Sequence, residues 1–420
     1  MNIKVLVPTG ALGITYCKKA LDKGLKEKPD IIVVDGGSTD SGPAYLGKGK
    51  SKYSRSSTKS EWKTLMVARE KLKIPLLIGS AGTCGTDKTV DWFLEITKEL
   101  AKELNQNIKI TLLKCSQSKK YINKAFLSKN LSPLNNAPKI SSKKIINCTN
   151  IVGLAGVEQI IDAINTKADI IICGRSTDAS LIASLPITKG VDKAIAWHAG
   201  KIGECGAFCT TNPRSGVILI SFKKNGFFIK PVSNNTKVTP YTVSAHMVYE
   251  NSNPFTLIEP GGHLDVKKAI YEKQKDGSVY VTGANWVKDN NYKIKLEGTY
   301  VVGYQSISIV LIRDESYVKN IKKWSKQVEN KVKKIVEKWG YNSILTSKKC
   351  DSGTDRISSV VLNLKKMGAD ITELEDGMII NGPKKLNGTF IKTYHDHRIA
   401  MAFEIASLVA KNNNLSLIHI

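Results

Sequence analysis

The first 180 residues alternate short apolar runs with segments of helical periodicity, and this alternation constrains the fold more than any other feature. The expected strands are the apolar runs 3–7, 30–34, 76–78, 108–113 and 169–173. Longer segments lie between them, such as 90–104, where apolar residues recur at intervals of three and four. Strands that alternate with helices form a mostly parallel sheet with helices on both faces. The sequence therefore predicts an α/β fold.

From about residue 190 the pattern becomes richer in strands. Apolar runs separated by Gly, Asn and Pro turns predict strands at 217–221, 280–282, 292–296 and 307–312. An amphipathic helix with one apolar face and one Lys-rich face is expected over 318–339, ending at Gly340. The organisation that we predict is an α/β ligand-binding domain over 1–190, an α+β domain over 191–342, a small α+β fragment over 350–410 and a non-native tail over 411–420.

Four expected strands of the first half run directly into loops rich in glycine and small polar residues. These loops are 8–13, 35–43, 79–85 and 174–178. Ligands of open α/β sheets bind beyond the carboxyl ends of strands, where glycines let backbone N–H groups approach an anion. Turns also need glycine for purely conformational reasons, but four such loops favour a shared crevice. The expected ligand contacts are Gly10, Ser38, Asp40, Gly79, Gly82, Arg175, Ser176 and Asp178.

Two polar segments interrupt this pattern. Residues 48–59 are rich in Lys, Ser and Gly and predict a flap near the crevice. Residues 116–144 are polar and basic and predict a long excursion between elements.

The candidate catalytic groups are His198, Glu204 and Asp35. His198 and Glu204 lie in one short stretch, and a His beside a carboxylate can move protons near neutral pH. Cys205 follows directly and could act as a nucleophile if its pKa were lowered. The alternative is an ordinary loop in which His198 packs or caps a helix. Asp35 could bind hydroxyls or a metal, or could cap the next helix.

A metal site and an anion clamp are also compatible with the sequence. His263 lies between two acids in a tight turn, and with His198, His246 and Asp35 it could form a metal site, although these residues are far apart in the sequence. We assign no metal ligands. Whether the protein uses a divalent metal, and whether its substrate is linked to CoA, are both left open. Arg175 could bind a carboxylate or phosphate in bidentate fashion, or could form a structural ion pair with Asp178 or another acid.

Composition excludes several partner classes. The formal net charge is +26, but only seven of the 63 basic residues are Arg, the residue that favours phosphate recognition, and the Lys residues are dispersed. We therefore expect no nucleic-acid partner. No apolar run reaches the roughly 18 residues of a membrane span, and the start of the chain lacks a signal peptide, so we expect a cytoplasmic protein without a membrane partner. The eight cysteines form no CxxC pair.

Several stretches in a fixed order resemble the acyclic terpene utilisation AtuA family over residues 1 to about 340. The stretches are 8–13, 35–43, 78–82, 174–178, 196–206, 259–262 and 296–298. The resemblance implies a cytoplasmic protein of branched or terpenoid acid catabolism. Its expected ligand is a small acidic metabolite or a CoA thioester, and its expected chemistry is that of a lyase, hydratase or isomerase. A non-catalytic subunit, a partner subunit and a homo-oligomer stay open.

The last seventy residues resemble a different family, 5-enolpyruvylshikimate-3-phosphate synthase. The matching stretches are 354–357, 365–370, 375–380 and 394–402. The resemblance implies that Arg356 and Arg398 bind phosphoenolpyruvate. Gly353 stands where that family has its acid/base glutamate, and we find no resemblance to the rest of that enzyme upstream. We therefore expect a truncated or misassembled gene whose tail lacks enolpyruvyl transferase activity, and residues 415–420 resemble a sequencing adapter.

Overall fold

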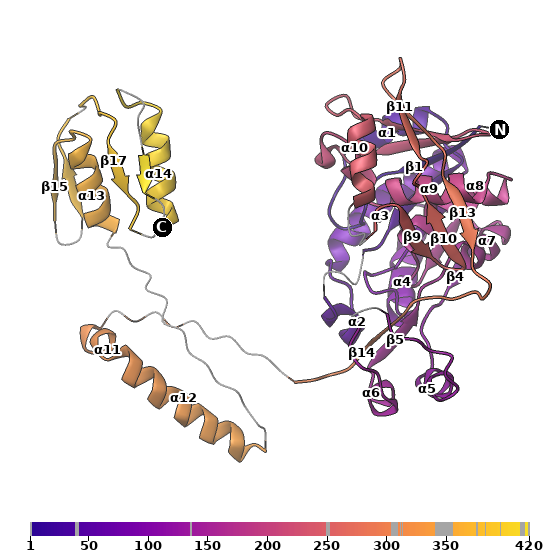
Figure 1. Cartoon of the computed structure of the whole chain (residues 1–420), viewed down its shortest axis with the longest axis horizontal. Coiled ribbons are helices and arrows are strands. Elements are labelled where there is room, and N and C mark those ends of the chain that lie inside the picture. Colours follow the sequence, from indigo (N-terminus) through magenta and orange to yellow (C-terminus); the bar gives the residue numbers. More distant parts are fainter. Residues whose placement is uncertain are drawn as a thin grey trace. The chain divides into compact units, whose positions relative to one another are not determined.

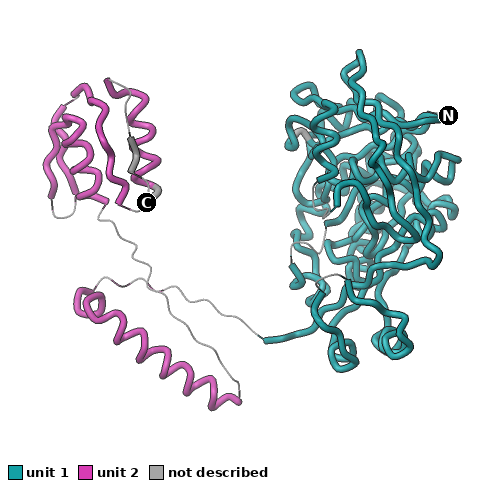
Figure 2. The backbone as a smooth tube through the Cα atoms, viewed as in Figure 1, with its two compact units in different colours: residues 1–304 teal, residues 305–420 magenta. Residues whose placement is uncertain are grey.

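The computed structural model describes residues 2–37, 42–134, 137–248, 253–303, 310, 312, 314–340, 356–374, 377–382, 384–394, 396–411 and 416–418. The chain divides into two compact units, residues 1–304 and 305–420 (Figure 2).

The first unit is built around a nine-stranded mixed sheet of order β11-β12-β8-β7-β1-β2-β3-β6-β4. Its parallel part consists of β1 (Ile3–Val7), β2 (Ile31–Asp35), β3 (Leu76–Gly79), β6 (Ile170–Cys173) and β4 (Ile110–Leu113). Its antiparallel part consists of β7 (Ile218–Phe222), β8 (Phe227–Pro231), β12 (Val279–Thr282) and β11 (Ile270–Lys273). The α/β prediction is confirmed.

Helices cover both faces of this sheet, because alternate side chains of the buried strands point to opposite faces. Val5 and Val33 pack into one core with α7 (Val157–Asn165), α8 (Asp178–Thr188) and α9 (Lys193–Gly203). Leu6 and Ile32 pack into the other core. Its helices are α1 (Lys18–Lys26), α3 (Arg55–Leu72) and α4 (Asp87–Glu103).

Smaller elements surround the sheet. A three-stranded sheet contains β13 (Asn285–Lys288), β10 (Gly262–Asp265) and β9 (Thr256–Glu259), and a ribbon pairs β14 (Leu296–Thr299) with β5 (Asn150–Gly153). The remaining helices of this unit are α2 (Ala44–Lys48), α5 (Lys119–Leu127), α6 (Ser142–Ile146) and α10 (Pro240–Ala245). Short 3-10 turns occupy Gly206–Cys209, Pro213–Ser215 and His246–Val248.

The polar excursion expected over 116–144 holds α5, which lies beside α6 (Figure 1). The strand expected at 292–296 begins only at Leu296. Tyr292 lies in the segment before this strand. Its ring packs against Gly261, and its hydroxyl donates to the Glu158 carboxylate at 3.0 Å. The strand expected at 307–312 lies largely outside the described residues.

The sheet continues across the domain boundary expected at residue 190. Strand β7 comes after that boundary and pairs with β1 along its whole length, from Ile3 with Phe222 to Val7 with Ile218. Residues 1–190 and 191–304 therefore share one sheet. Among the described residues, no helix combines the length and the apolar character needed to cross a bilayer.

The second unit begins with two helices, α11 (Glu315–Lys319) and α12 (Ile321–Lys338). They form the expected amphipathic segment, but no residue of α12 is buried within the described structure. The rest of this unit comprises α13 (Arg356–Lys366), β15 (Ile371–Glu373), β16 (Met378–Ile380), β17 (Phe390–Lys392), α14 (His397–Ser407) and β18 (Ser416–Ile418).

A small core joins the elements of this tail. Met367, Ile391, Ile399 and Phe403 are buried together. The fully buried Asn363 of α13 fastens the helix to β17, because its amide donates to the Lys392 carbonyl at 2.9 Å and accepts from the Lys392 N–H at 3.2 Å. The segment expected to be a non-native tail includes β18, which pairs in parallel with β17.

Candidate active site

The Gly-rich loops meet at the carboxyl edge of the parallel strands, because β1, β2, β3 and β6 are neighbours in the sheet. Their glycines permit close approach of one backbone to another. A Cβ atom at Gly10 would lie 2.8 Å from the backbone of Cys205, and one at Gly36 would lie 2.5 Å from the Ser80 carbonyl oxygen. One at Gly79 would lie 2.4 Å from Leu181. The lack of a side chain at these glycines therefore lets the loops pack closely against each other, against Leu181 of α8 and against the backbone of Cys205.

Part of the segment expected as a flap lies beside these loops, whereas residues 55–59 belong to the start of α3. The Lys52 N–H donates to Thr83 Oγ1 at 3.2 Å, and the Tyr53 ring occupies the space above Gly13, whose φ is +110°. The nearby Asp35 carboxylate and burial raise the pKa of Tyr53. Gly82, with φ +65°, packs against Thr89. Ser38 and Asp40, two expected ligand contacts, lie outside the described residues.

Arg175 is buried and is held by carboxylates on two sides. Its Nε and Nη2 donate to the two carboxylate oxygens of Glu297 at 3.1 and 3.3 Å, and its Nη1 lies 3.7 Å from Asp178. Nη1 also donates to Ser80 Oγ at 3.1 Å and to the Ser176 carbonyl at 3.3 Å. This is the structural ion pair that the sequence left open beside ligand binding. Arg175 and Lys295 together hold the pKa of Glu297 at about 2.

A second buried ion pair lies at the end of α9. Lys201 Nζ lies 2.9 Å from Glu204 and 3.7 Å from Glu259, which ends β9. All three side chains are less than 15% exposed, at 14%, 12% and 6%. Burial raises the pKa of Glu204 to about 8, and Lys201 opposes that rise. Burial also raises the pKa of Glu259, which Lys201 and the Thr177 hydroxyl oppose.

Asp178 connects the two ion pairs. Its negative charge raises the pKa values of Asp35, Glu204 and Glu259, so it lies within electrostatic reach of all three. The close crossing of α8 and α9 places it there, since a Cβ atom at Gly200 would lie only 2.4 Å from the carbonyl oxygen of Ala179. Asp178 is also the most exposed acid among these ion pairs, at 28%. Asp178, at the start of α8, is therefore the acid of these ion pairs that solvent reaches most.

Asp35 completes the cluster from the end of β2. Its carboxyl is buried, and burial together with Asp178 raises its pKa well above the ordinary value. Oδ2 accepts from the Gly37 N–H at 3.0 Å. Oδ1 and the hydroxyl of Ser176 have no hydrogen-bond partner among the described residues. Asp35 Oδ1 and Ser176 Oγ are therefore candidate contacts for a ligand at this edge of the sheet.

His198 lies in different surroundings from Glu204. Its Nε2 lies 3.1 Å from the Tyr271 hydroxyl, and its ring packs edge-on against Phe227 and Tyr271. Burial lowers the pKa of His198 to about 3, so the ring is neutral at physiological pH. The sequence placed His198 and Glu204 in one catalytic stretch, whereas the described contacts give them different partners.

The residues weighed for a metal site are also dispersed. Among the described residues, no group of three His, Cys, Asp or Glu side chains has an arrangement that could hold a metal ion. His246 belongs to a 3-10 turn and is buried, and Lys201 contributes to lowering its pKa to about 4. His263 lies on β10 between its partners Ile258 and Val287.

Four charged members of the cluster were not singled out as site residues: Lys201, Glu259, Lys295 and Glu297. The sequence did carry a signal for three of them. Glu259 and Glu297 are the acidic residues of two Gly-containing stretches in the AtuA resemblance, and Lys201 lies one helical turn before Glu204. Their connection to Asp178 and Arg175 requires long-range contacts, which periodicity does not reveal.

The two arginines expected to bind an anion in the tail are joined by one carboxylate. Asp396 accepts from Arg356 Nε at 2.7 Å and from the Arg398 backbone N–H at 2.8 Å, which caps α14. Arg398 therefore lies in the first turn of α14, and the side chain of Arg356, from the start of α13, reaches the Asp396 cap of that helix. Gly353 lies outside the described residues.

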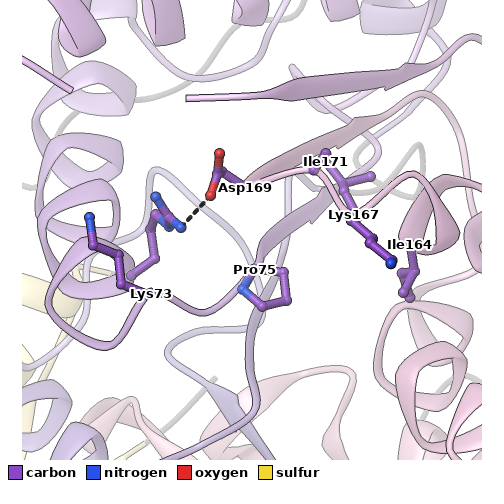
Figure 3. A pocket seen from close by; sticks show the side chains of 8 residues that line it. Lys73, Pro75, Ile164, Lys167, Asp169 and Ile171 are labelled. Carbon is purple, nitrogen blue, oxygen red and sulfur yellow. Dashed lines mark hydrogen bonds and ion pairs between the residues drawn. The ribbon is translucent and has the colours of Figure 1, made fainter. Parts of the chain in front are cut away.

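A separate cavity of about 210 Å³ lies at the opposite edge of the main sheet, beside Pro75 and Asp169, which precede β3 and β6 (Figure 3). Arg69 lines this cavity. Its guanidinium donates to Asp169 and Glu70 at 2.7 Å and to the Ile74 carbonyl at 3.0 Å. These partners occupy all three nitrogens of Arg69, so we interpret its contacts as structural ion pairs.

Two family models match the chain, and their matched ranges overlap over residues 346–381. The family model "Acyclic terpene utilisation family protein AtuA" matches residues 43–381. The chain belongs to the AtuA family. Within this AtuA protein, the EPSP synthase (3-phosphoshikimate 1-carboxyvinyltransferase) family model matches residues 346–418. Both resemblances seen in the sequence are confirmed.

Curated relatives of this AtuA protein match parts of it. A 3-phosphoshikimate 1-carboxyvinyltransferase of Methanococcus maripaludis strain C6 is 52% identical over 61 residues, 14% of each chain. One from Alkaliphilus oremlandii is 57% identical over 58 residues, again 14% of each chain. One from M. maripaludis strain C5 is 33% identical over 204 residues, 46% of this chain and 43% of its own.

The AtuA protein therefore spans less than half the length of these curated relatives. The match to strain C5 covers more of the chain than residues 346–418, so the expectation that nothing upstream resembles the synthase was wrong. No solved structure matches the chain.

Proposed function

We propose that this AtuA protein is an enzyme of branched or terpenoid acid catabolism that moves a proton on an acyl substrate at the carboxyl edge of its sheet. Glu204 is the proton carrier. The observation that carries this proposal is its buried carboxyl, whose pKa of about 8 lets it hold or release a proton near neutral pH while Lys201 stays beside it at 2.9 Å.

The surrounding groups support this role. Glu259 and Asp178 keep proton affinity high at Glu204, and the charge of Lys201 stabilises the carboxylate once the proton has left. Asp35, whose pKa is raised and whose Oδ1 has no hydrogen-bond partner within the described part of the chain, is a second carboxyl that can supply a proton. A pair of groups that gives and takes a proton is what hydratase, lyase and isomerase chemistry requires.

The test is proton exchange, which does not require the complete reaction to be known. Full-length protein is incubated in D2O with branched acyl-CoA thioesters, and deuterium incorporation next to the carbonyl is followed by mass spectrometry. We expect exchange with the natural protein and at least about a hundredfold loss in Glu204→Gln. Glu103→Gln is the matched control, because Glu103 is an exposed acid that pairs with Lys59 and Lys63.

His198→Gln separates the two proton carriers considered from the sequence. Loss of exchange in this variant with full exchange in Glu204→Gln would assign the role to His198 and contradict the proposal. Exchange by the purified chain alone would exclude the alternative of a non-catalytic subunit that needs a partner.

For the tail, we propose that residues 346–418 do not perform enolpyruvyl transfer in this chain. Support comes from the glycine at 353, where the related family is expected to have its glutamate, and from the chain's coverage of less than half of each synthase named above, 14% to 43% of their length. Phosphate release from shikimate 3-phosphate with phosphoenolpyruvate is the measurement. Release above background, in the natural chain or in Gly353→Glu, would contradict the proposal.

A further inference from the structure

The charges of the cluster restrict what part of a substrate can enter it. Five carboxyl groups belong to it, and three cations oppose them: the buried Arg175 and Lys201, and the half-exposed Lys295. The carboxyl groups are Asp35, Asp178, Glu204, Glu259 and Glu297. Each of the three cations therefore faces at least one carboxyl group of the protein, and the nearby His246 is neutral.

Each cation is already engaged by protein carboxylates. Arg175 faces Glu297 at 3.1 Å and Asp178 at 3.7 Å, and Lys201 faces Glu204 at 2.9 Å and Glu259 at 3.7 Å. Lys295 lies 2.9 Å from Glu297. A substrate carboxylate brought into this cluster would have to displace one of these acids or lie beside them. Both are unfavourable, because a buried charge needs a counter-charge of its own.

Two other buried polar groups of the cluster are available for uncharged hydrogen-bond partners. Asp35 Oδ1 and the Ser176 hydroxyl are both more than nine-tenths buried and have no hydrogen-bond partner among the described residues. Ser176 follows Arg175 directly, and Asp35 lies within the electrostatic reach of Arg175 and Asp178. A hydroxyl can donate to a carbonyl oxygen, and a carboxyl group can bond to a hydroxyl or a carbonyl.

We infer that the part of the substrate that enters this cluster is uncharged, so that the ligand is an acyl thioester with a carbonyl or hydroxyl group and not a free carboxylate. This inference rests on the proposed function and narrows it, since the sequence allowed both an acidic metabolite and a CoA-linked one. The anionic portion of a CoA ester would remain outside the cluster, where the lysine-rich surface of a chain of net charge +26 can attract it.

A matched pair of probes tests the inference on the full-length protein. The probes are 3-hydroxy-3-methylbutyrate and its N-acetylcysteamine thioester, which carries no phosphate and no net charge. Isothermal titration at pH 7 measures both dissociation constants. We expect the thioester to bind at least about tenfold more tightly than the acid. Equal or tighter binding of the free acid would overturn the inference, as would the absence of thioester binding.

Charge-removing variants give a second readout. Asp178→Asn and Glu297→Gln each remove one acid that engages Arg175, so the ratio of the two dissociation constants should shift toward the free acid by about tenfold. Asp178 is partly exposed, so Asp178→Asn keeps the test valid if Glu297→Gln fails to fold. Glu103→Gln removes the same charge at the far end of α4 and should leave the ratio unchanged.

A ratio that is the same in Asp178→Asn as in the natural protein would also overturn the inference. The outcome is distinguishable from failure of the proposed function, because that function is judged by deuterium exchange in Glu204→Gln. A preference for the thioester without any deuterium exchange would support the inferred class of ligand and contradict the proton-transfer role of Glu204.

Discussion

The ammonium group of Lys201 lies 2.9 Å from the carboxylate of Glu204, one helical turn further along, and both side chains are almost completely buried. The pKa values of the two groups are raised by different causes. Burial raises the pKa of Glu204 to about 8, whereas the neighbouring carboxylates raise the pKa of Lys201 and keep it protonated. The pair can therefore change its charge near neutral pH through Glu204 while Lys201 remains a fixed cation.

Replacing Lys201 with Met should destabilise the protein by about 3–5 kcal/mol above the pKa of Glu204, because it then leaves the ionised Glu204 and Glu259 buried without a counter-charge. Urea unfolding at pH 9 measures the change. Lys193→Met is the control: Lys193 pairs with Glu158 at a site where the two side chains are 47% and 41% exposed, so its loss should cost no more than about 1 kcal/mol. Similar losses in both variants would contradict the buried ion pair.

Replacing Asp178 with Asn should lower the pKa of Glu204, since the Asp178 charge is one of the groups that raises it. The carboxyl carbon resonance of Glu204 in 13C-labelled protein reports this pKa directly. A raised carboxyl pKa contributes stability that is present below pH 4.5 and is lost as the pH rises through about 8. We therefore expect Asp178→Asn to lose less stability between pH 5 and pH 9 than the natural protein.

The stability of the protein should fall in acid partly because of His198. Burial lowers its pKa from 6.5 to about 3, so its contribution is present above pH 6.5 and is lost as the pH falls toward 3. His198→Phe removes a titrating group but keeps an aromatic ring beside Tyr271 and Phe227. Chemical unfolding at pH 7 and pH 4.5 should show a smaller acid loss in this variant, by on the order of 2–3 kcal/mol. His246, whose pKa is also lowered, accounts for part of what remains.

Replacing Gly200 with Ala should force α8 and α9 apart, because the added Cβ would lie 2.4 Å from a backbone oxygen. Overpacking of this kind costs about 1–3 kcal/mol and would also move Asp178 relative to Lys201. Thermal unfolding and the Glu204 resonance together check both effects. Gly303→Ala serves as the control, since no described atom lies within 4 Å of that position. An unchanged Glu204 pKa in Gly200→Ala would mean that the crossing does not position Asp178.

The sequence by itself determined the parallel part of the sheet and the loops at its carboxyl edge. Strand β2 and the Asp35 at its end can be predicted from the local sequence, because an apolar run followed by glycines is a pattern of neighbouring residues. The family motifs likewise named Arg175 and Glu204 from short stretches. The amphipathic helix before Gly340 was equally clear, because its 3.6-residue period is a local property.

Only the tertiary structure decided which of these groups share a site. Arg175 meets Glu297 across 122 positions of the chain, and Lys201 meets Glu259 only because β9 ends beside α9. His198 and Glu204 are six residues apart, yet they differ in partners because the sides of a helix contact different elements. Charge pairing and burial depend on contacts between distant segments, and the pKa values that define this site follow from them.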